Sequence, residues 1–382
     1  MRKRLVSLVL SISIMLPLAF CSNRQVFAAT TELKVSAKAS ILYCANNGQV
    51  LLSHDAEKEL PIASTTKIMT ALLALEAYAA DSKPFEFTSS MAAEGSSMYL
   101  KPGYKLTLRD CAVGMMMASG NDGANAVALH ISGNFNDFAK LMNERAKQIG
   151  MKHTNFVTPS GLDDCDHCST AYDMAVLLAY AMDNDDFADI TSKTSMQVKF
   201  ANPDGTIYTY PNHNRLLKSY QYCIGGKTGF TKKAGRCLVS VAEKDGVRLV
   251  AVTLNDPSDW NDHKSMFDYG FSKLRGITLD DSNLHLTIPV VGGDCENITT
   301  NCAMTKNIVI ENGQENNVVR TVEVPQFVYA PVGQGDVIGE VKYTLNGKMI
   351  AQNEISVANT VNFRAQKKNI FQKILEFFGF KD

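Results

Sequence analysis

The sequence predicts an α/β protein, with an antiparallel sheet packed against a cluster of helices and a small all-β domain towards the C-terminal end. Short β-like runs occur between residues 33 and 52 and again between 207 and 254, whereas residues 62–190 are mostly helical in pattern. Almost only short strands with Gly-containing turns follow, from 280 to 360. Because the helices lie between the two sets of strands along the chain, we expect the first hairpin to join the last strands in one sheet.

Size and charge restrict the possible classes of function. The chain has 382 residues, 45% of them hydrophobic and 20% charged, which is enough for one large domain and a smaller one. The formal net charge is −1, and it becomes about −8 for the body of the chain once the basic N-terminal segment and the basic C-terminal tail are set aside. Nucleic-acid binding depends on neutralising phosphates with Lys and Arg. An acidic body therefore argues against nucleic acid as a partner.

The first 29 residues are typical of a secretory signal peptide. Basic residues and no acidic one accompany an apolar stretch from Leu5 to Phe20, and two small residues, Ala28 and Ala29, follow. We expect cleavage near these alanines and export of the mature chain. Two alternatives remain open, an uncleaved membrane anchor and a lipoprotein site at Cys21, although the apolar stretch is short for a spanning helix.

A loop that runs into a helix carries the first candidate site. Pro61 precedes a run rich in Ala, Leu and Met that extends to Glu76, and Ser64 lies where the first helical turn is expected. Lys67 then lies one turn further along on the same face, with its amine in reach of the Ser64 hydroxyl. The pattern Ser-x-x-Lys therefore indicates a nucleophile with its own base. The alternative interpretation is an N-cap at Ser64 and a solvated charge at Lys67.

The remaining elements follow from hydrophobic pattern and turn residues. Asn-Gly between two apolar runs predicts a hairpin over residues 41–52. Residues 106–117 predict a Met-rich helix that ends at Ser119-Gly120-Asn121, and we interpret its methionines as core packing rather than as a cofactor or metal site. We further expect helices over 124–131 and 136–149, an antiparallel meander over 207–254 and a closing helix over 258–274.

Eight cysteines remain after the signal peptide. An even number in an exported chain permits disulfides. The predicted hairpin suggests a pair of Cys223 with Cys237, and a short loop suggests a pair of Cys295 with Cys302. Free thiols buried as small apolar side chains are the alternative.

One loop resembles part of a zinc site. Cys165-x-x-Cys168 occurs together with His167 and His153. Structural zinc needs four converging ligands, and the sequence has no second Cys/His pair at a suitable spacing. We therefore expect a structured loop here and no metal.

Residues 361–382 have apolar positions at helical spacing, surrounded by lysines. A short basic amphipathic helix lies in a membrane interface rather than across it, so we expect this tail to bind a membrane surface. Packing against the β-rich domain or against a partner is the alternative. The expected organisation is a signal peptide over 1–29, a main domain over 30–277, a β-rich domain over 278–360 and the tail.

Two further motifs follow the first along the chain. Ser119-x-Asn121 ends a predicted helix, and Lys227-Thr228-Gly229 lies on a predicted strand. Ser-x-x-Lys, Ser-x-Asn and Lys-Thr-Gly in this order form the signature of penicillin-binding proteins and serine β-lactamases. In an exported chain, the ordered set resembles the low-molecular-mass penicillin-binding proteins, the serine-type D-alanyl-D-alanine carboxypeptidases of the peptidase S11 family. Further matching segments are Tyr99-Leu100-Lys101-Pro102-Gly103, Gly161-Leu162, Ser169-Thr170-Ala171 and Asn214-Arg215-Leu216-Leu217.

The resemblance implies a β-lactamase/transpeptidase-like fold, an antiparallel sheet with a helical cluster. It implies removal of the terminal D-alanine from peptidoglycan pentapeptides through an acyl-enzyme, without a cofactor and without a metal. Peptidoglycan stem peptides and β-lactam inhibitors are the implied partners. A peripheral position at the outer face of the bacterial cytoplasmic membrane is the implied location.

Five residues are implied to be catalytic. Ser64 attacks the peptide carbonyl, and a neutral Lys67 serves as its base because Lys227 lies nearby and depresses its proton affinity. Ser119 passes a proton to the departing D-alanine. Asn121 orients the substrate amide.

Three residues on the predicted strand are implied to bind substrate: Thr228, Gly229 and Phe230. Thr228 and Lys227 hold the terminal carboxylate, and the backbone N–H groups of Ser64 and Phe230 form the oxyanion hole. Relatives commonly have histidine where this chain has Phe230, so only the backbone role is carried over. Some relatives also bind the carboxylate with an arginine, which has no counterpart in the segment where it is expected, and His263 and Lys264 are the candidates there.

Two other functions remain as alternatives. A serine β-lactamase shares the three motifs, but the class A type needs a glutamate to activate the deacylating water, and the middle of the chain contains no Glu-x-x-Leu-Asn. A non-catalytic scaffold that binds peptidoglycan is the second. The three intact motifs argue against it.

Overall fold

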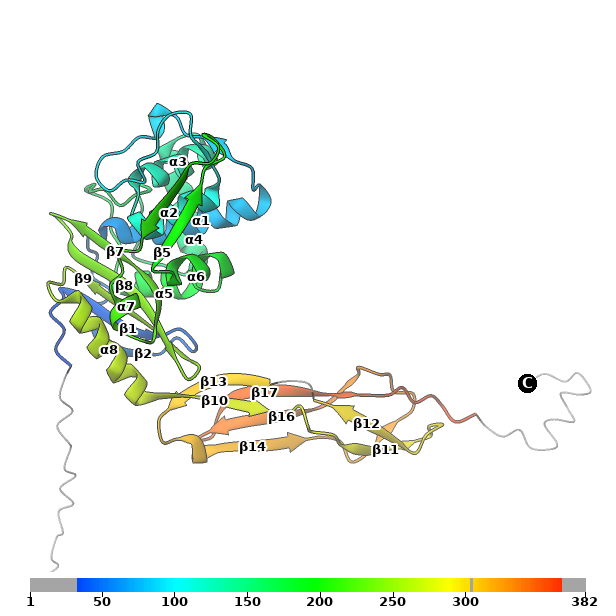
Figure 1. Cartoon of the computed structure of the whole chain (residues 1–382). Coiled ribbons are helices and arrows are strands. Elements are labelled where there is room, and N and C mark those ends of the chain that lie inside the picture. Colours follow the sequence, from blue (N-terminus) through cyan, green and yellow to red (C-terminus); the bar gives the residue numbers. More distant parts are fainter. Residues whose placement is uncertain (1–32, 303–304, 366–382) are drawn as a thin grey trace, which may run out of the picture. The chain divides into compact units, whose positions relative to one another are not determined.

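The computed structural model describes residues 33–302 and 305–365 of the chain (Figure 1). The predicted signal peptide lies outside the described residues, as does the tail from residue 366 onwards. The first residues of the predicted tail helix, 361–365, are not helical, because Val361 and Phe363 form β-bridges with Val332 and Gly293. Among the described residues, none of the helices combines the length and the apolar character needed to cross a bilayer.

An antiparallel sheet of five strands organises the first part of the chain. The strand order is β2-β1-β9-β8-β7, so the N-terminal hairpin pairs with β9, as the sequence predicts. The mixed α/β architecture is thereby confirmed. The strands are β1 (Ala39–Cys44), β2 (Val50–His54), β7 (Cys223–Thr231), β8 (Gly235–Lys244) and β9 (Val247–Leu254).

Helices cover both faces of this sheet. Side chains along its central strands point alternately to the two faces, and each set packs against helices. Val239 of β8 and Val252 of β9 belong to the main hydrophobic core, together with residues of α1, α2 and α5. On the opposite face, Ser240 and Thr253 form hydrogen bonds with His263 of α8. The helices are α1 (Lys67–Ala80), α2 (Leu108–Ala118), α3 (Asn121–Ser132), α4 (Phe135–Ile149), α5 (Ala171–Ala181), α6 (Asp185–Ser192), α7 (Leu216–Ser219) and α8 (Asp259–Lys273).

The predicted helices over 106–117, 124–131, 136–149 and 258–274 are confirmed to within a few residues. The methionines of α2 are buried in the core, as expected. The predicted meander was partly wrong: β6 (Ile207–Pro211) pairs with β5 (Ser195–Lys199) in a separate hairpin. The segment after β6 contains α7, which separates β6 from the main sheet. A further two-stranded pair consists of β3 (Phe85–Glu86) and β4 (Lys105–Leu106).

The second part of the chain is β-rich, as predicted. Six strands form one sheet in the order β14-β16-β17-β12-β11-β15, and β10 pairs with β13. Strand β10 crosses the predicted domain boundary between residues 277 and 278. The strands are β10 (Leu274–Asp280), β11 (Thr287–Val291), β12 (Asn297–Asn301), β13 (Thr305–Glu311), β14 (Val318–Glu323), β15 (Val328–Tyr329), β16 (Val337–Leu345) and β17 (Lys348–Val357).

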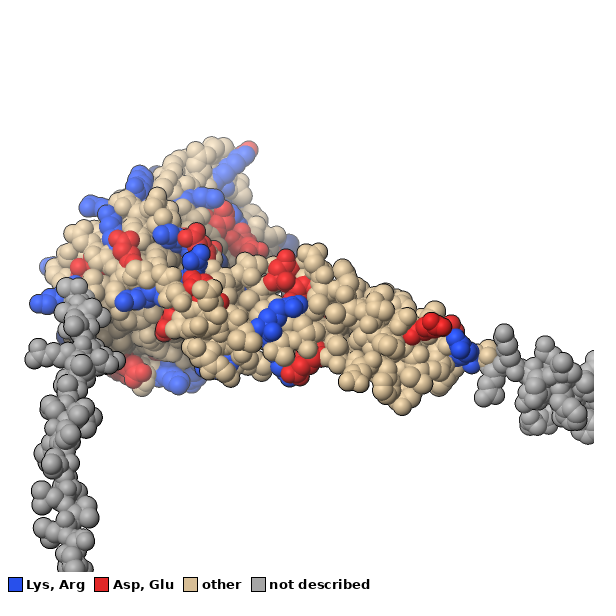
Figure 2. All heavy atoms as spheres, turned by 90° about the horizontal axis from the view of Figure 1, so that it is seen from below, with Lys and Arg blue, Asp and Glu red and all other residues tan. Residues whose placement is uncertain are grey.

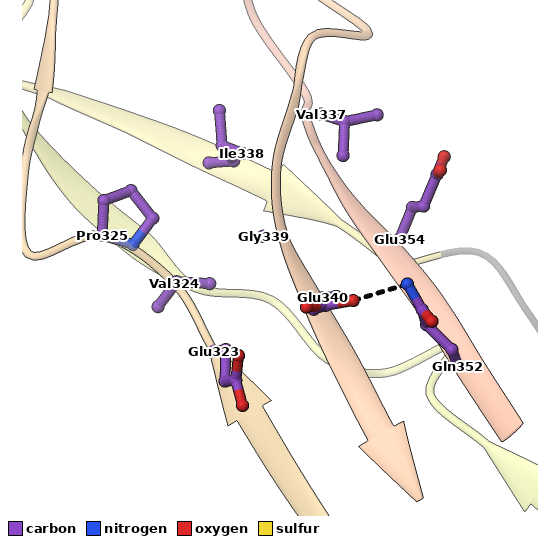
Figure 3. Close-up of a pocket in the computed structure, with 9 residues that line it drawn as sticks. All are labelled: Glu323, Val324, Pro325, Val337, Ile338, Gly339, Glu340, Gln352 and Glu354. Atoms are coloured by element: carbon purple, nitrogen blue, oxygen red, sulfur yellow. Dashed lines mark hydrogen bonds between the residues drawn. The ribbon is translucent and has the colours of Figure 1, made fainter. Parts of the chain in front are cut away.

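A groove of about 460 Å³ lies in this β-rich part (Figure 3). Three glutamates lie side by side on the neighbouring strands β14, β16 and β17: Glu323 is paired with Glu340, and Glu340 with Glu354. Lys342 forms ion pairs with Glu323 and Glu340. Apolar side chains and Gln352 complete the lining, which contains no serine, cysteine or histidine. The groove therefore offers no hydroxyl, thiol or imidazole nucleophile.

The suggested pair of Cys223 with Cys237 was wrong. In the β7/β8 ladder, Cys223 lies opposite Ala242 and Cys237 lies opposite Gly229, so the two sulfurs are far from bonding distance. Cys295 is an exposed free thiol and is not bridged to Cys302.

Candidate active site

A short 3₁₀ turn, Ala63–Thr66, holds Ser64 immediately before α1. The threonine hydroxyls close this turn, because Thr65 donates to the Ile62 carbonyl and Thr66 to the Ala63 carbonyl. No side chain caps the turn or α1. The Ser64 hydroxyl is therefore not used as an N-cap, and it faces a cleft.

Two glycines allow other segments to approach this turn closely. A Cβ at Gly161, which has a φ of +79°, would lie 1.9 Å from the Ala63 carbonyl oxygen. A Cβ at Gly229 would lie 2.9 Å from the Ile62 oxygen and 3.1 Å from the Ser64 nitrogen. Glycine at both positions brings the 160–161 loop and strand β7 against Ser64.

His167 ties the Cys165-x-x-Cys168 loop to the same turn. Its Nδ1 accepts hydrogen bonds from the backbone N–H groups of Val157 and Thr158, so its Nε2 carries the proton and donates to the Thr66 hydroxyl. Burial lowers the pKa of His167 to about 4. The ring is neutral and both of its nitrogens are occupied, which makes His167 a structural support of the turn.

Lys67 is fully buried beside Ser64. Its Nζ lies 2.9 Å from the Ser64 Oγ and 2.7 Å from the Ser160 carbonyl oxygen. Burial lowers the pKa of Lys67 well below its ordinary value, and the positive charge of Lys227 lowers it further. A lysine in such a place gives up its proton readily, and the neutral amine can then accept the proton of a hydroxyl.

Ser119 and Lys227 form a second pair of hydroxyl and amine. Ser119 ends α2 in the left-handed conformation, with a φ of +58°. Lys227 of β7 is buried, and its Nζ lies 3.0 Å from the Ser119 Oγ and 2.8 Å from the Thr228 carbonyl oxygen. Burial lowers the pKa of Lys227 to about 7.

Asn121 is the first residue of α3. Its Nδ2 donates to the Glu94 carbonyl, whereas its Oδ1 is buried and has no hydrogen-bond partner among the described residues. A buried acceptor without a partner is costly, so this oxygen is available to a ligand N–H. The next residue, Asp122, accepts from Ser97 and from the backbone of Leu100, which fixes the loop beside Asn121.

Ser64 and Ser119 line a cleft of about 500 Å³, whereas Lys67, Asn121 and Lys227 lie behind its surface and are not among the lining residues. The predicted residues Thr228, Gly229 and Phe230 line it along β7, and Phe230 is 66% exposed at the rim. The structure thus brings the three motifs together at one cleft. The other lining residues are Ser64, Ser96, Ser119, His213, Arg215, Arg236, Cys237, Asp259 and Trp260.

The two expected candidates for carboxylate binding are not at the cleft. His263 is fully buried between Ser240 and Thr253, and burial lowers its pKa to about 3. Lys264 does not line the cleft. Two residues of the site, Ser160 and Arg236, lie outside the motifs of the sequence. The second could have been found from the hairpin register, because it lies opposite Phe230.

Comparison with known proteins agrees with this geometry. Residues 25–258 match the family model for D-alanyl-D-alanine carboxypeptidases, and residues 280–362 match the model for the C-terminal domain of penicillin-binding protein 5. D-alanyl-D-alanine carboxypeptidase DacF of Bacillus subtilis is 32% identical and covers 93% of each chain. DacC of Escherichia coli is also 32% identical, over 96% of this chain and 92% of the relative.

Solved structures show the same relationship. Penicillin-binding protein 5 from Haemophilus influenzae superposes with a TM-score of 0.66 at 29% identity, over 86% of this chain and 98% of that chain. A D-alanyl-D-alanine carboxypeptidase from Mycobacterium tuberculosis has a TM-score of 0.56 at 32% identity, over 63% of this chain and 94% of that chain. With the three motifs gathered at one cleft and both parts of the chain matched, the chain belongs to the D-alanyl-D-alanine carboxypeptidase family of serine hydrolases, peptidase S11.

Proposed function

We propose that Ser64 is the nucleophile by which this D-alanyl-D-alanine carboxypeptidase removes the terminal D-alanine of a peptidoglycan stem peptide. The 2.9 Å separation of the Ser64 Oγ and the Nζ of a fully buried Lys67 carries the proposal. Lys67 takes the hydroxyl proton as Ser64 attacks the carbonyl carbon of the penultimate residue. A serine hydroxyl is a weak nucleophile without such a base.

The second half of the first step expels D-alanine. As the ester bond to Ser64 forms, the peptide C–N bond breaks, and the leaving amine takes a proton from the Ser119 hydroxyl. Lys227, 3.0 Å from the Ser119 oxygen, replaces the proton that Ser119 gives up, so that Lys67 is protonated and Lys227 is neutral once the acyl-enzyme has formed. Water then hydrolyses the ester, which releases the shortened peptide as a carboxylic acid and returns the proton to Ser64.

Substrate orientation is proposed to come from both sides of the cleft. The unpaired Oδ1 of Asn121 accepts the N–H of the substrate amide. The backbone N–H groups of Ser64 and Phe230 stabilise the oxyanion, because β7 passes close to the serine turn at Gly229. Thr228 and Lys227 face the terminal carboxylate.

Incubation with a pentapeptide and with penicillin tests this function. The full chain is expected to release one D-alanine per pentapeptide, and mass spectrometry is expected to show a long-lived penicilloyl adduct on Ser64. Rapid turnover of nitrocefin without a persistent adduct would identify a β-lactamase instead. A chain that binds peptidoglycan but forms no adduct and releases no alanine would identify a scaffold.

We further propose that the protein is exported and lies peripherally at the outer face of the cytoplasmic membrane. The signal-like segment over 1–29 and the basic amphipathic pattern predicted over 361–382, of which residues 366–382 follow the β-rich part, support this. Deletion of residues 366–382 is expected to abolish sedimentation with anionic lipid vesicles, while the rate of acylation by penicillin stays unchanged. The full-length mature chain is the control, and its binding is expected to weaken with salt. Equal sedimentation of both chains would contradict the proposal.

A further inference from the structure

The groove in the β-rich part has an acidic row next to an apolar end. Figure 3 shows Pro325, Val337 and Ile338 at one end of it, and Glu323 and Glu340 at the other. Three glutamates line the groove, and the only ion pairs that the described residues offer them are those of Lys342 with the first two. Three carboxylates and one ammonium leave a net charge of −2 on these side chains.

The charge that is left over lies mainly on Glu354 of β17. Lys342 is 2.7 Å from a carboxylate oxygen of both Glu323 and Glu340, and Gln352 donates a further hydrogen bond to Glu340. Within residues 33–302 and 305–365, the Glu354 side chain has neither an ion pair nor a hydrogen bond. This exposed carboxylate is therefore available to a further cation.

The apolar end of the groove is open to solvent. Val337 is 57% exposed, although it begins a central strand of the sheet. Gly339 draws the end of β14 against β16, since a Cβ there would lie 2.4 Å from the Glu323 carbonyl oxygen and 2.7 Å from the Val324 side chain. Exposed apolar side chains beside carboxylates suit a segment that carries both apolar and basic residues.

The chain itself contains such a segment directly after the β-rich part. Residues 366–382 carry four lysines and two acidic residues, a net charge of +2. Apolar residues at helical spacing, among them Ile370, Phe371 and Ile374, lie between the lysines. The charge and the apolar pattern of this tail are complementary to those of the groove.

The tail is also long enough to reach the groove. Ser356 pairs with Val337 at the open end, and residue 365 follows nine positions later, which is at most about 32 Å of chain. The 17 residues of the tail can extend over about 56 Å. Val361 and Phe363 are held by β-bridges to Val332 and Gly293, so the tail starts from a fixed point of the same part of the chain.

We propose that residues 366–382 dock in this groove, with lysines at the glutamates and apolar side chains at Val337 and Ile338. An anionic membrane surface binds the same segment, so the groove and the membrane compete for it. The proposal goes beyond the carboxypeptidase function. Its second half rests on the membrane binding proposed above.

Zero-length crosslinking of the full mature chain with a carbodiimide tests the docking. The reagent joins a lysine amine to a carboxylate only where the two are in contact, and mass spectrometry locates the bond. We expect bonds from tail lysines to Glu323, Glu340 and Glu354. Their yield is expected to be independent of protein concentration and to fall with salt.

Glu354→Lys and Glu311→Lys form a matched pair of variants. Both replace an exposed glutamate on a strand of the β-rich part and change the net charge equally, but Glu311 does not line the groove. The crosslinks to Glu323 and Glu340, which both variants retain, are expected to fall about fivefold in Glu354→Lys, because an attraction becomes a repulsion. In Glu311→Lys they are expected to stay within about twofold of the wild-type yield.

Sedimentation with vesicles of phosphatidylcholine and phosphatidylglycerol tests the competition. A docked tail lowers the apparent affinity for the membrane by the fraction of chains in which the tail is free. Glu354→Lys is therefore expected to bind vesicles about two- to fivefold more tightly than Glu311→Lys, which corresponds to a tail docked about 50–80% of the time. Vesicles are expected to suppress the crosslinks in the wild type.

The outcomes separate the two halves of the inference. Wild-type crosslinks to the groove glutamates that are no more abundant than those to Glu311 would overturn the docking. A yield that rises with protein concentration would assign the groove to the tail of a second copy and overturn it as well. Equal vesicle affinity of the two variants would overturn the competition. Crosslinks in a wild type that does not sediment with vesicles would uphold the docking and contradict the membrane binding.

Discussion

Ser64→Ala is expected to reduce D-alanine release by about 10⁴- to 10⁶-fold, the range seen when a catalytic serine is removed from a hydrolase. The Ser64 hydroxyl is the group proposed to form the acyl bond. Among the residues that the structure describes, no other serine side chain lies within hydrogen-bond distance of the Lys67 amine. Two measurements check this. Alanine release from a pentapeptide reports turnover, and intact-protein mass spectrometry after penicillin treatment reports the adduct, which is expected to be absent.

Ser160→Ala is the matched control for this variant. Ser160 is also buried beside Lys67, but it contacts the amine through its carbonyl oxygen, which alanine retains. We expect penicillin to acylate Ser160→Ala at nearly the wild-type rate. A penicilloyl adduct on Ser64→Ala would contradict the assignment of the nucleophile. Loss of the adduct in both variants, with unchanged thermal unfolding, would place Ser160 in the chemistry as well.

The outline of the fold could be predicted because patterns of short range determine it. The Asn-Gly turn predicts the first hairpin, and the 3.6-residue periodicity predicts α2, α4 and α8. The five-stranded sheet followed from the order of elements along the chain. The separate β5/β6 hairpin did not, since its two strands have the same residue types as sheet strands and only tertiary pairing distinguishes them.

The site was predictable to the extent that its residues occur in motifs. Lys67 lies at hydrogen-bond distance from Ser64, and Lys227 lies at hydrogen-bond distance from Ser119. The serines of both pairs line the same cleft. Ser160 was missed because it contributes a backbone carbonyl, which any residue has.

Arg236 was missed for another reason. Its place at the cleft depends on strand register and on the start of α8, where Asp259 holds it. The cysteine pairing failed on register too: the β7/β8 ladder pairs Thr231 with Gly235, which places Cys237 opposite Gly229, six residues away from Cys223.

Lys67→Met is expected to lower the rate of acylation by penicillin about 10²- to 10⁴-fold at pH 7, the contribution typical of a positioned general base. Methionine has a similar length and suits a fully buried position, but it cannot accept the Ser64 proton. In the wild type, acylation is expected to increase with pH as Lys67 loses its proton. This increase occurs below the ordinary lysine pKa, because burial and the charge of Lys227 lower the pKa of Lys67. The variant is expected to lose the increase.

Thermal unfolding adds a readout that does not depend on catalysis. Because the pKa of Lys67 is lowered on folding, the unfolded chain binds more protons than the folded chain between the lowered value and the ordinary value of 10.5. The free energy of unfolding of the wild type therefore rises with pH in that window relative to Lys67→Met. The exposed Lys58, paired with Asp55 at the surface, provides the control, and Lys58→Met is expected to change neither acylation nor this pH dependence. The prediction would be contradicted if penicillin acylated Lys67→Met at the wild-type rate at pH 7 and the difference in free energy of unfolding between wild type and variant did not change with pH. Residue 67 would then neither accept the proton nor titrate in the folded chain.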